Sequence, residues 1–176
     1  EHDTVQRELS ELVEISHAIG YDPFLVQGTG GNTSVKTEGD AYMYIKASGY
    51  ALKDLSVGNG WRRLDVSRVM AILGNKELEG LSESHREEVV KEQLQFSCDD
   101  NMEKWIRPSV ESLMHVVLDR YVIHLHALPV LCFACAVNGK KEFFRLFEGD
   151  NSLHPVWISY ANPGYSIGRE VADSAQ

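Results

Sequence analysis

The sequence predicts an α/β layered domain in which helices flank a central mixed or antiparallel sheet. Helical and strand-like patterns alternate irregularly along the 176 residues, and one pair of strand-like segments is joined by a short turn. Hydrophobic residues make up 43% of the chain and charged residues 24%, which fits one compact domain with a sizeable core. No internal repeat, low-complexity segment or linker divides the chain, so we expect a single domain over residues 1–176.

The first half of the chain is expected to place a helix before a hairpin. Asp3 or Thr4 can cap a helix whose apolar positions follow helical spacing, and Gly20 is placed to end it. Segments 33–36 and 41–47 flank a Thr-Glu-Gly-Asp turn and therefore predict an antiparallel hairpin. The other elements expected before residue 97 are a helix over 66–73 capped by Asp65 and a helix through 87–96 capped by Ser82 or Ser84.

The second half is expected to alternate between helices and strands. Pro108 fits the first turn of a helix that runs through Val117, because that position loses no hydrogen bond to proline. The other expected elements are a strand from 121 that holds His124 and His126, a helical apolar stretch at 127–137, an apolar strand at 156–160, and a last helix from about Ser166 after the turn at 162–164.

The overall charge excludes two classes of partner. The net charge is −9 and the pI is near 5.2, and an anionic surface repels both nucleic acid and anionic membranes. Any anionic ligand must therefore be met locally, by backbone amides or a few placed cations. No apolar run reaches the ~20 residues that a membrane span needs, and the start lacks a secretory signal, so we expect a cytoplasmic protein.

The three cysteines, Cys98, Cys132 and Cys135, form an odd set that a disulfide framework would not use. Cys132 and Cys135 have the Cys-x-x-Cys spacing of redox and zinc motifs, but the chain contains no second pair and their neighbours are apolar. We therefore predict that these two are buried core cysteines.

His124 and His126 lie two residues apart, after the apolar start of a predicted strand. Side chains at positions i and i+2 of a strand project to one face, so both imidazoles should point the same way. Neutral imidazole nitrogens bind zinc and other divalent metals, and a pair supplies two of the three protein ligands common in catalytic zinc sites. Paired strand histidines also occur as packing or hydrogen-bonding residues, so the neighbouring motifs decide between the two interpretations.

The segment before this strand adds a carboxylate and a hydroxyl. Helical spacing puts Glu111 and His115 on one face, and Ser109 presents a hydroxyl and an amide at the helix N-terminus. A carboxylate near two metal-bound imidazoles is suited to proton transfer. The structural alternatives are that Glu111 matches the helix dipole and that His115 is a satisfied core histidine.

Two glycine-containing segments are candidates for anion binding. The loop Gly28-Thr-Gly-Gly-Asn-Thr-Ser34 leaves an apolar segment and enters the hairpin, where its amides, hydroxyls and the Asn32 amide could cradle an anion. Ser48 and Gly49 end the second strand of the hairpin and could join the same site. The loop is neither a Walker loop nor a dinucleotide fingerprint, and an ordinary glycine-rich turn is the alternative.

Taken together and in this order, the motifs Gly-Thr-Gly-Gly-Asn-Thr-Ser, Ser-Gly, Pro-Ser-x-Glu-x-x-x-His and His-x-His resemble the class II aldolase/adducin family from about residue 4 to the end. The Pro-Ser-Val-Glu form and the segment Ser-Tyr-Ala-Asn-Pro-Gly at 159–164 are most similar to the N-terminal aldolase domain of bifunctional rhamnulose-phosphate aldolase/short-chain dehydrogenase proteins. The resemblance implies a class II aldolase-like fold, a divalent metal that is usually zinc, and a homotetramer with its sites between subunits.

The resemblance also implies roles for individual residues. His124 and His126 match two metal ligands, and Glu111 matches the acid/base carboxylate. The residues that match substrate-phosphate positions are Thr29, Gly31, Asn32, Ser48, Gly49 and Ser109. The sugar-phosphate aldolases usually carry a second serine where this chain has Val110, which removes one phosphate contact.

The third metal ligand of the family has no match in this sequence. It lies in an Asn-His-Gly motif, which does not occur here, and His154 precedes the Pro163-Gly164 turn instead of following it. We expect the third ligand beyond Gln176, and a metal that is loosely held or absent without it.

The implied function is reversible cleavage of a ketose 1-phosphate into dihydroxyacetone phosphate and an aldehyde, a reaction of carbohydrate metabolism. The metal would polarise the ketose carbonyl, and Glu111, with a pKa raised toward neutrality by burial, would move the proton. Two alternatives stay open. One is a pentulose-phosphate epimerase or a dehydratase of the same family, and the other is a noncatalytic adducin-like binding or assembly module.

Overall fold

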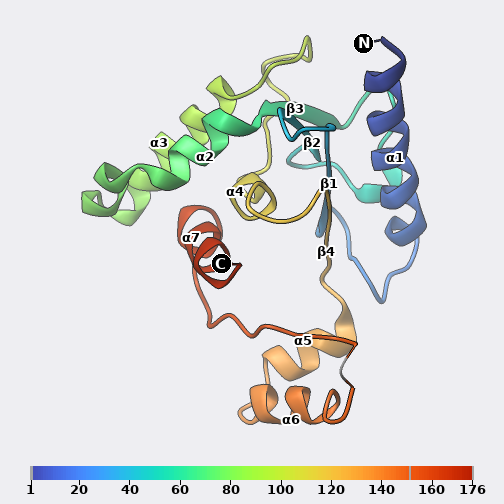
Figure 1. Ribbon diagram of the computed structural model, residues 1–176, viewed down its shortest axis with the longest axis vertical. Helices are drawn as coiled ribbons and strands as arrows, with labels where there is room; N and C mark the ends of the chain where they lie inside the picture. The colour runs from blue at the N-terminus through green and yellow to red at the C-terminus, as the bar shows by residue number, and fades with distance from the viewer. Residues whose placement is uncertain (1, 151, 176) are drawn as a thin grey trace.

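The structure is a computed structural model that describes residues 2–150 and 152–175, with side chains from Arg7 onward. The described residues form a four-stranded sheet with the strand order β3-β2-β1-β4, and every neighbouring pair is antiparallel (Figure 1). The strands are β1 (Asn32–Lys36), β2 (Tyr42–Lys46), β3 (Trp61–Asp65) and β4 (Tyr121–His124). The predicted hairpin is β1 and β2, and the sheet predicted as mixed or antiparallel is antiparallel.

Seven α-helices and two short 3-10 helices accompany the sheet in the described part of the chain. They are α1 (His2–Gly20), η1 (Leu52–Asp54), α2 (Val66–Gly74), η2 (Lys76–Gly80), α3 (Glu83–Phe96), α4 (Ser112–His115), α5 (Leu128–Ala134), α6 (Gly139–Arg145) and α7 (Tyr165–Ser174). Within the residues described, none of these helices has both the length and the apolar composition needed to cross a membrane. The last helix begins next to the predicted start.

Strand alternation divides the core between the two faces of the sheet. On β2, Met43 and Ile45 point into a cluster that includes residues of α2, α3 and α7, whereas Tyr44 between them packs with Leu9 and Leu12 of α1. Helix α1 therefore covers one face, and the other helices around the core cover the opposite face (Figure 1). Burial of such side chains contributes about 1.5–3 kcal/mol each to stability.

Strand β1 carries buried polar side chains on both faces, and each of them has a partner. Toward α4, the Ser34 Oγ lies 2.8 Å from Nδ1 of His115. Toward α1, the Thr33 Oγ1 lies 2.7 Å from the Ser16 Oγ. Because buried polar groups are costly unless they are hydrogen-bonded, these contacts fix how α1 and α4 lie against the sheet.

The sequence pattern does not predict β3, because two consecutive arginines interrupt its apolar positions. Arg62 is 2% exposed, and its Nε donates to Oδ2 of Asp100 at 3.0 Å while its Nη1 donates to the carbonyl of Ile106. The same Asp100 oxygen accepts the backbone amide of Arg63 at 2.8 Å. The buried ion pair and the bond to Ile106 hold residues 100–106 against β3. These residues lead into the segment that carries Glu111.

The predicted caps differ in outcome. Asp65 accepts a hydrogen bond from the backbone amide of Arg68 at 3.1 Å and caps α2 as predicted. Ser82 occupies the N-cap position of α3, but its side chain makes no capping hydrogen bond. The predicted capping of the first helix by Asp3 or Thr4 falls outside the described side chains.

The helix predicted from Pro108 to Val117 is wrong in length. Its helical part is only α4, Ser112–His115, so Pro108 lies outside it. The carbonyl of Ser109 accepts both the backbone amide of Ser112, at 3.1 Å, and its hydroxyl, at 2.6 Å. Such local side-chain bonds compete with a longer helix, and Ser109 therefore precedes a short turn instead of beginning a full helix.

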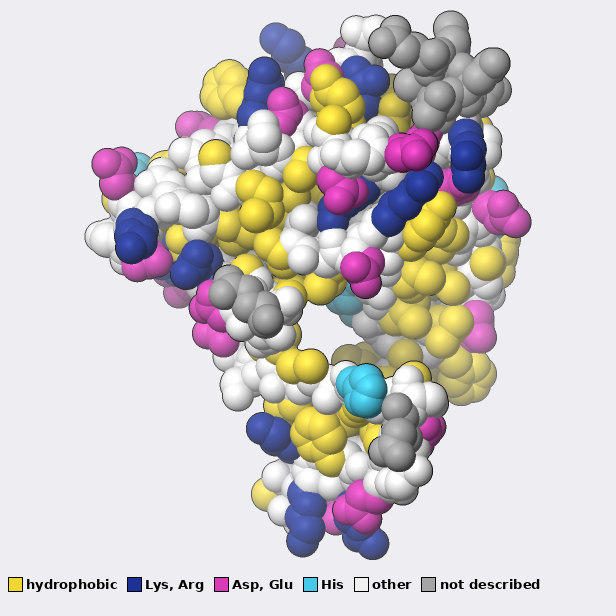
Figure 2. Space-filling model, viewed as in Figure 1, with side chains coloured by type: hydrophobic (Ala, Val, Ile, Leu, Met, Phe, Trp, Pro, Cys, Tyr) yellow, Lys and Arg dark blue, Asp and Glu magenta, His cyan; other side chains and the backbone are white. Residues whose placement is uncertain are grey.

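Helices α5 and α6 form a small lobe set apart from the sheet, and an opening separates this lobe from the rest of the molecule (Figures 1 and 2). In the lobe, Phe143 packs edge-on against Phe133 and Trp157, with ring centroids 5.9 and 5.8 Å apart. The predicted apolar helix is α5, but the prediction that Cys132 and Cys135 are buried is wrong, because so small a lobe leaves much of α5 exposed.

The third cysteine, Cys98, is partly buried, and burial raises the pKa of its thiol to about 12. The strand predicted at 156–160 is wrong, since these residues belong to no strand and lead from the lobe back to α7. Two of the apolar residues in this segment, Val156 and Ile158, instead line a cavity.

We expect Arg62→Ala to lower the free energy of unfolding by about 3–5 kcal/mol, because it leaves the buried Asp100 carboxylate without its partner. Urea denaturation measures the change. The matched control is Arg145→Ala, which removes an exposed arginine paired with Glu142 and should cost less than about 1 kcal/mol. Equal losses in the two variants would contradict the anchoring role of Arg62.

Candidate active site

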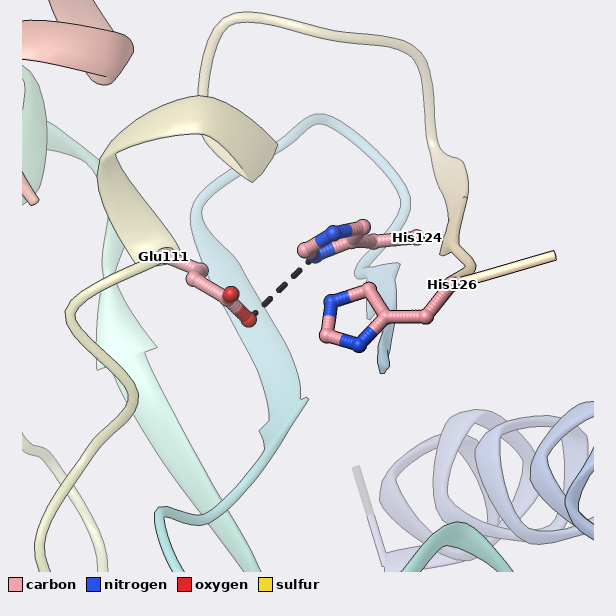
Figure 3. Close-up of side chains that lie close together, drawn as sticks. All are labelled: Glu111, His124 and His126. Atoms are coloured by element: carbon pink, nitrogen blue, oxygen red, sulfur yellow. Dashed lines mark ion pairs between the residues drawn. The ribbon is translucent and has the colours of Figure 1, made fainter. Parts of the chain in front are cut away.

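Three of the predicted site residues meet at one point. Glu111 lies at the start of α4, His124 ends β4, and His126 follows two residues later. One ligand atom from each of them lies within 4.8 Å of the others, and the side chains point toward one another (Figure 3). The structure therefore brings together the residues that the sequence assigns to acid/base chemistry and to metal binding.

The register between β1 and β4 creates this meeting point. Asn32 of β1 stands directly opposite His124 of β4. The Asn32 Nδ2 donates to Oε2 of Glu111 at 3.1 Å, and the same oxygen lies 3.3 Å from Nδ1 of His124. Asn32 is 1% exposed, so it positions Glu111 from inside the core.

His126 reaches the site although the strand ends before it. Its backbone amide donates to the carbonyl of Leu25 at 3.0 Å, and its ring centroid lies 5.0 Å from that of His124. Its Nδ1 lies so close to Gly30 that a Cβ built there would stand 2.7 Å away. The predicted placement of both rings on one side is confirmed, but the backbone of His126 is held by its hydrogen bond to Leu25 and not by a continuous strand ladder.

Glu111 is ionised in this arrangement. Burial raises the pKa of its carboxyl, but the contact with His124 and the hydrogen bond from Asn32 outweigh burial, and the pKa falls to about 2. The expectation that burial lifts this pKa toward neutrality is therefore wrong. The carboxyl group of Glu111 is therefore in its carboxylate form at neutral pH.

His115 occupies the core and stays outside the cluster. It is 1% exposed, bonds Ser34, and has a ring centroid 6.5 Å from that of His124. Burial, with repulsion from His124 as the next cause, lowers the pKa of its imidazole to about 3. The interpretation of His115 as a core histidine therefore fits its position.

The cluster suits a divalent cation. Among the described residues, Nδ1 of His124 is buried without a hydrogen-bond partner, and its contact with Glu111 is not aligned as a hydrogen bond. A buried imidazole nitrogen without a partner beside a carboxylate is the donor set that zinc and similar metals take. The cluster lines a cavity of about 710 Å³, and Val156, Ile158 and Val171 also line this cavity.

The predicted anion-binding residues differ in how free they are to bind a ligand. Thr29 is exposed, whereas Gly31 is buried at a φ of 73° against Val26. Ser48 and Gly49 form an exposed turn, in which the Ser48 amide is occupied by the carbonyl of Arg107 at 3.0 Å and is not free for an anion.

Ser109 and Asn32, both predicted to contact phosphate, already have partners on Glu111. The Ser109 Oγ accepts the backbone amide of Glu111 at 3.2 Å, and within the described residues its hydroxyl donates no hydrogen bond. The Asn32 side chain donates one of its amide protons to the Glu111 carboxylate. These two residues therefore hold the Glu111 carboxylate in place. The residue types in the motifs do not by themselves reveal this role.

Sequence reasoning misses two residues of this region. Gly30 allows the close approach of His126, and its place in a glycine-rich loop is the signal that could have pointed to it. Lys46 is 3% exposed and sends its Nζ to three backbone carbonyls beside the loop. Burial lowers the pKa of Lys46, and the charge of Glu111 acts in the opposite direction.

Comparison with known sequences agrees with this arrangement. Residues 10–176 match the model of the Class II Aldolase and Adducin N-terminal domain. The chain is 27% identical over 173 residues to the Uncharacterized oxidoreductase YuxG of Bacillus subtilis, a match that covers 94% of this chain and 23% of that protein. The chain thus spans less than a quarter of the curated relative, which is consistent with a resemblance to one domain of a bifunctional protein.

Two solved structures share the fold. The N-terminal Class II Aldolase domain of a conserved protein from Thermoplasma acidophilum matches with a TM-score of 0.76 and 26% identity, over 95% of this chain and 75% of that chain. YgbL from Klebsiella pneumoniae, a candidate aldolase/epimerase/decarboxylase, matches with a TM-score of 0.51 and 15% identity, over 76% and 51% of the two chains. Because the family model spans nearly the whole chain, this protein belongs to the class II aldolase/adducin family.

Proposed function

We propose that this chain is the aldolase domain of a metal-dependent enzyme that cleaves a ketose 1-phosphate reversibly into dihydroxyacetone phosphate and an aldehyde. The observation that carries the proposal is the convergence of Glu111, His124 and His126 on one cavity. The cavity, at about 710 Å³, falls within the size range of small-molecule sites. Family membership supports lyase chemistry at this position.

His124 and His126 would hold the metal, with zinc as the native ion that imidazole ligands favour. When bound, the metal would supply Lewis-acid chemistry by stabilising negative charge that develops on the ketose carbonyl oxygen. The third histidine implied by the family resemblance stays a prediction, as do the homotetramer and the cytoplasmic location.

Glu111 would move the proton at the substrate carbon. Its carboxylate is the base form at neutral pH, and Asn32 and the Ser109 hydroxyl fix it at both the side chain and the backbone. In the synthetic direction it would take a proton from the three-carbon substrate. In the cleavage direction the same carboxyl would return that proton, as microscopic reversibility requires.

The phosphate would bind at the loops that carry Thr29, Ser48, Gly49 and Ser109. Hydrogen bonds link these loops: Lys46 donates to the carbonyl of Thr29, and the Ser48 amide donates to the carbonyl of Arg107. The exposed turn of Ser48 and Gly49 lines a second, smaller cavity of about 260 Å³ through Ser48. Val110 also lines this cavity and contributes no hydroxyl. Binding of the phosphate would therefore depend more on backbone amides and on positively charged side chains than it does in relatives that have a second serine.

Product analysis distinguishes the aldolase from the other family reactions. The full-length protein loaded with zinc should release dihydroxyacetone phosphate and an aldehyde from a ketose 1-phosphate. Inversion at one carbon without cleavage would instead identify an epimerase. Metal binding without turnover on any phosphorylated ketose would favour a noncatalytic adducin-like module.

We expect Glu111→Gln to lower kcat by 10²–10⁴-fold, the range typical of acid/base groups, while one metal per chain remains bound. Glutamine keeps an oxygen that can accept the Asn32 amide proton, so the side chain should stay in place. Steady-state kinetics with metal analysis measures both effects. The control is Glu103→Gln at an exposed site, which should leave kcat unchanged. Full activity in Glu111→Gln would remove Glu111 from the mechanism.

We expect Gly30→Ala to weaken zinc binding by about 10–100-fold, the range seen when residues that support metal ligands are changed. The new methyl group would stand 2.7 Å from Nδ1 of His126 and 2.9 Å from the carbonyl of Gln27. Calorimetric titration with zinc measures the affinity. Gly58→Ala, where nothing lies within 4 Å, is the control. Unchanged affinity in Gly30→Ala would show that His126 is not a ligand.

A further inference from the structure

The turn at residues 162–165 connects the segment that follows the α5–α6 lobe to helix α7 (Figure 1). This part of the chain supplies apolar lining to the cavity that also contains Glu111, His124 and His126. The apolar lining residues from the segment, the turn and α7 are Val156, Ile158, Ala161, Pro163, Ile167 and Val171. The Ser-Tyr-Ala-Asn-Pro-Gly motif at 159–164 ends in this turn, and the proposed function gives that motif no role.

Glu87 of α3 holds the turn from outside the cavity. Its Oε1 accepts the backbone amide of Tyr165 at 3.2 Å. A Cβ built on Gly164 would overlap Oε2 of the same carboxylate, so only glycine lets the turn approach Glu87 this closely. Gly164 also has a φ of 102°, a conformation that residues with a side chain rarely adopt. The Glu87 carboxylate and the glycine of the turn therefore fit each other.

Two more residues of α3 contact the turn or the residue that follows it. Glu83 accepts a hydrogen bond from the side-chain amide of Asn162, and Arg86 donates to the Ser166 Oγ at 3.3 Å. The Arg86 guanidinium also lies over the ring of Tyr165, 5.5 Å from its centroid. Because residues three and four positions apart share one face of a helix, a single face of α3 holds the turn.

The segment before the turn has little else to fix it. Residues 156–160 belong to no strand, and within the described residues they make no backbone hydrogen bond. At the lobe end, Trp157 packs edge-on against Phe143 with ring centroids 5.8 Å apart. At the other end the segment leads directly into the turn that α3 holds. The position of the apolar lining therefore depends on these two ends.

We infer that Glu87 is a positioning residue that fixes the apolar lining of the cavity through the turn, and that it thereby sets how tightly the site binds the carbon chain of its substrate. The inference rests on the proposed function in naming a substrate. Glu87 itself does not line the cavity. Its loss should therefore weaken substrate binding and leave the proton-transfer step at Glu111 nearly unchanged.

Trp157 reports the position of the segment without any substrate. The full-length protein can be labelled with 5-fluorotryptophan, and the fluorine NMR resonance of Trp157 is assigned by its loss in Trp157→Phe. We expect Glu87→Ala to shift or broaden this resonance. Glu87→Gln keeps an oxygen that can accept the Tyr165 amide, so it should leave the resonance in place. Glu88→Ala, at the exposed neighbouring position of α3, is the control and should also leave it in place.

Steady-state kinetics on a ketose 1-phosphate tests the effect on the site. We expect Glu87→Ala to raise KM about tenfold, as the loss of one methylene-sized apolar contact does, and to change kcat less than about twofold. Gly164→Ala disturbs the same contact from the turn and should act in the same direction. Glu87→Gln should restore KM. Zinc affinity should stay within about twofold of the wild type in every variant, because none of them touches His124 or His126.

Several results would overturn the inference. An unmoved Trp157 resonance in Glu87→Ala would do so and would leave the proposed function standing. A loss of kcat at unchanged KM, or a Trp157 shift in Glu88→Ala as large as in Glu87→Ala, would also contradict it. Urea denaturation of each variant identifies a shift that comes from general unfolding, which would equally count against the role of Glu87. A selective shift in Glu87→Ala, in a protein that cleaves no ketose phosphate, would support the positioning role and contradict the proposed function instead.

Discussion

The register that pairs Asn32 with His124 is the constraint on which the site depends. It places one amide side chain beside a metal-ligand candidate and within 3.1 Å of the Glu111 carboxylate at the start of α4. A shift of the register by one residue would turn His124 to the opposite face of the sheet. The antiparallel pairing of β1 and β4 therefore determines both the fold at this edge and the chemistry of the cavity.

Burying the polar side chains of β1 costs free energy, which hydrogen bonds to neighbouring residues offset in part. Asn32 and Ser34 lie in the core, and hydrogen bonds to Glu111 and His115 satisfy part of their polar groups. Within the described residues, Nε2 of His115 and Oδ1 of Asn32 still lack partners. Buried polar groups of this kind are tolerated where they serve a site, and here they surround the candidate metal ligands.

The sequence allows the hairpin, the cap of α2, the helix α5 and the meeting of Glu111 with His124 and His126 to be predicted, because periodicity and motif order are local signals. It does not predict β3, since the burial of Arg62 depends on Asp100 far along the chain. The exposed Cys132 and the unpaired segment 156–160 also escape prediction, because an apolar segment gives no sign of whether it packs in a core or lines a cavity.

Anomalous diffraction from crystals of the zinc-loaded protein, measured at the zinc absorption edge, tests the central claim that these side chains share one metal. We predict a single strong peak in each chain, within bonding distance of the His124 and His126 imidazoles and on the side that faces Glu111. A zinc peak elsewhere, with these two imidazoles free of metal, would contradict it.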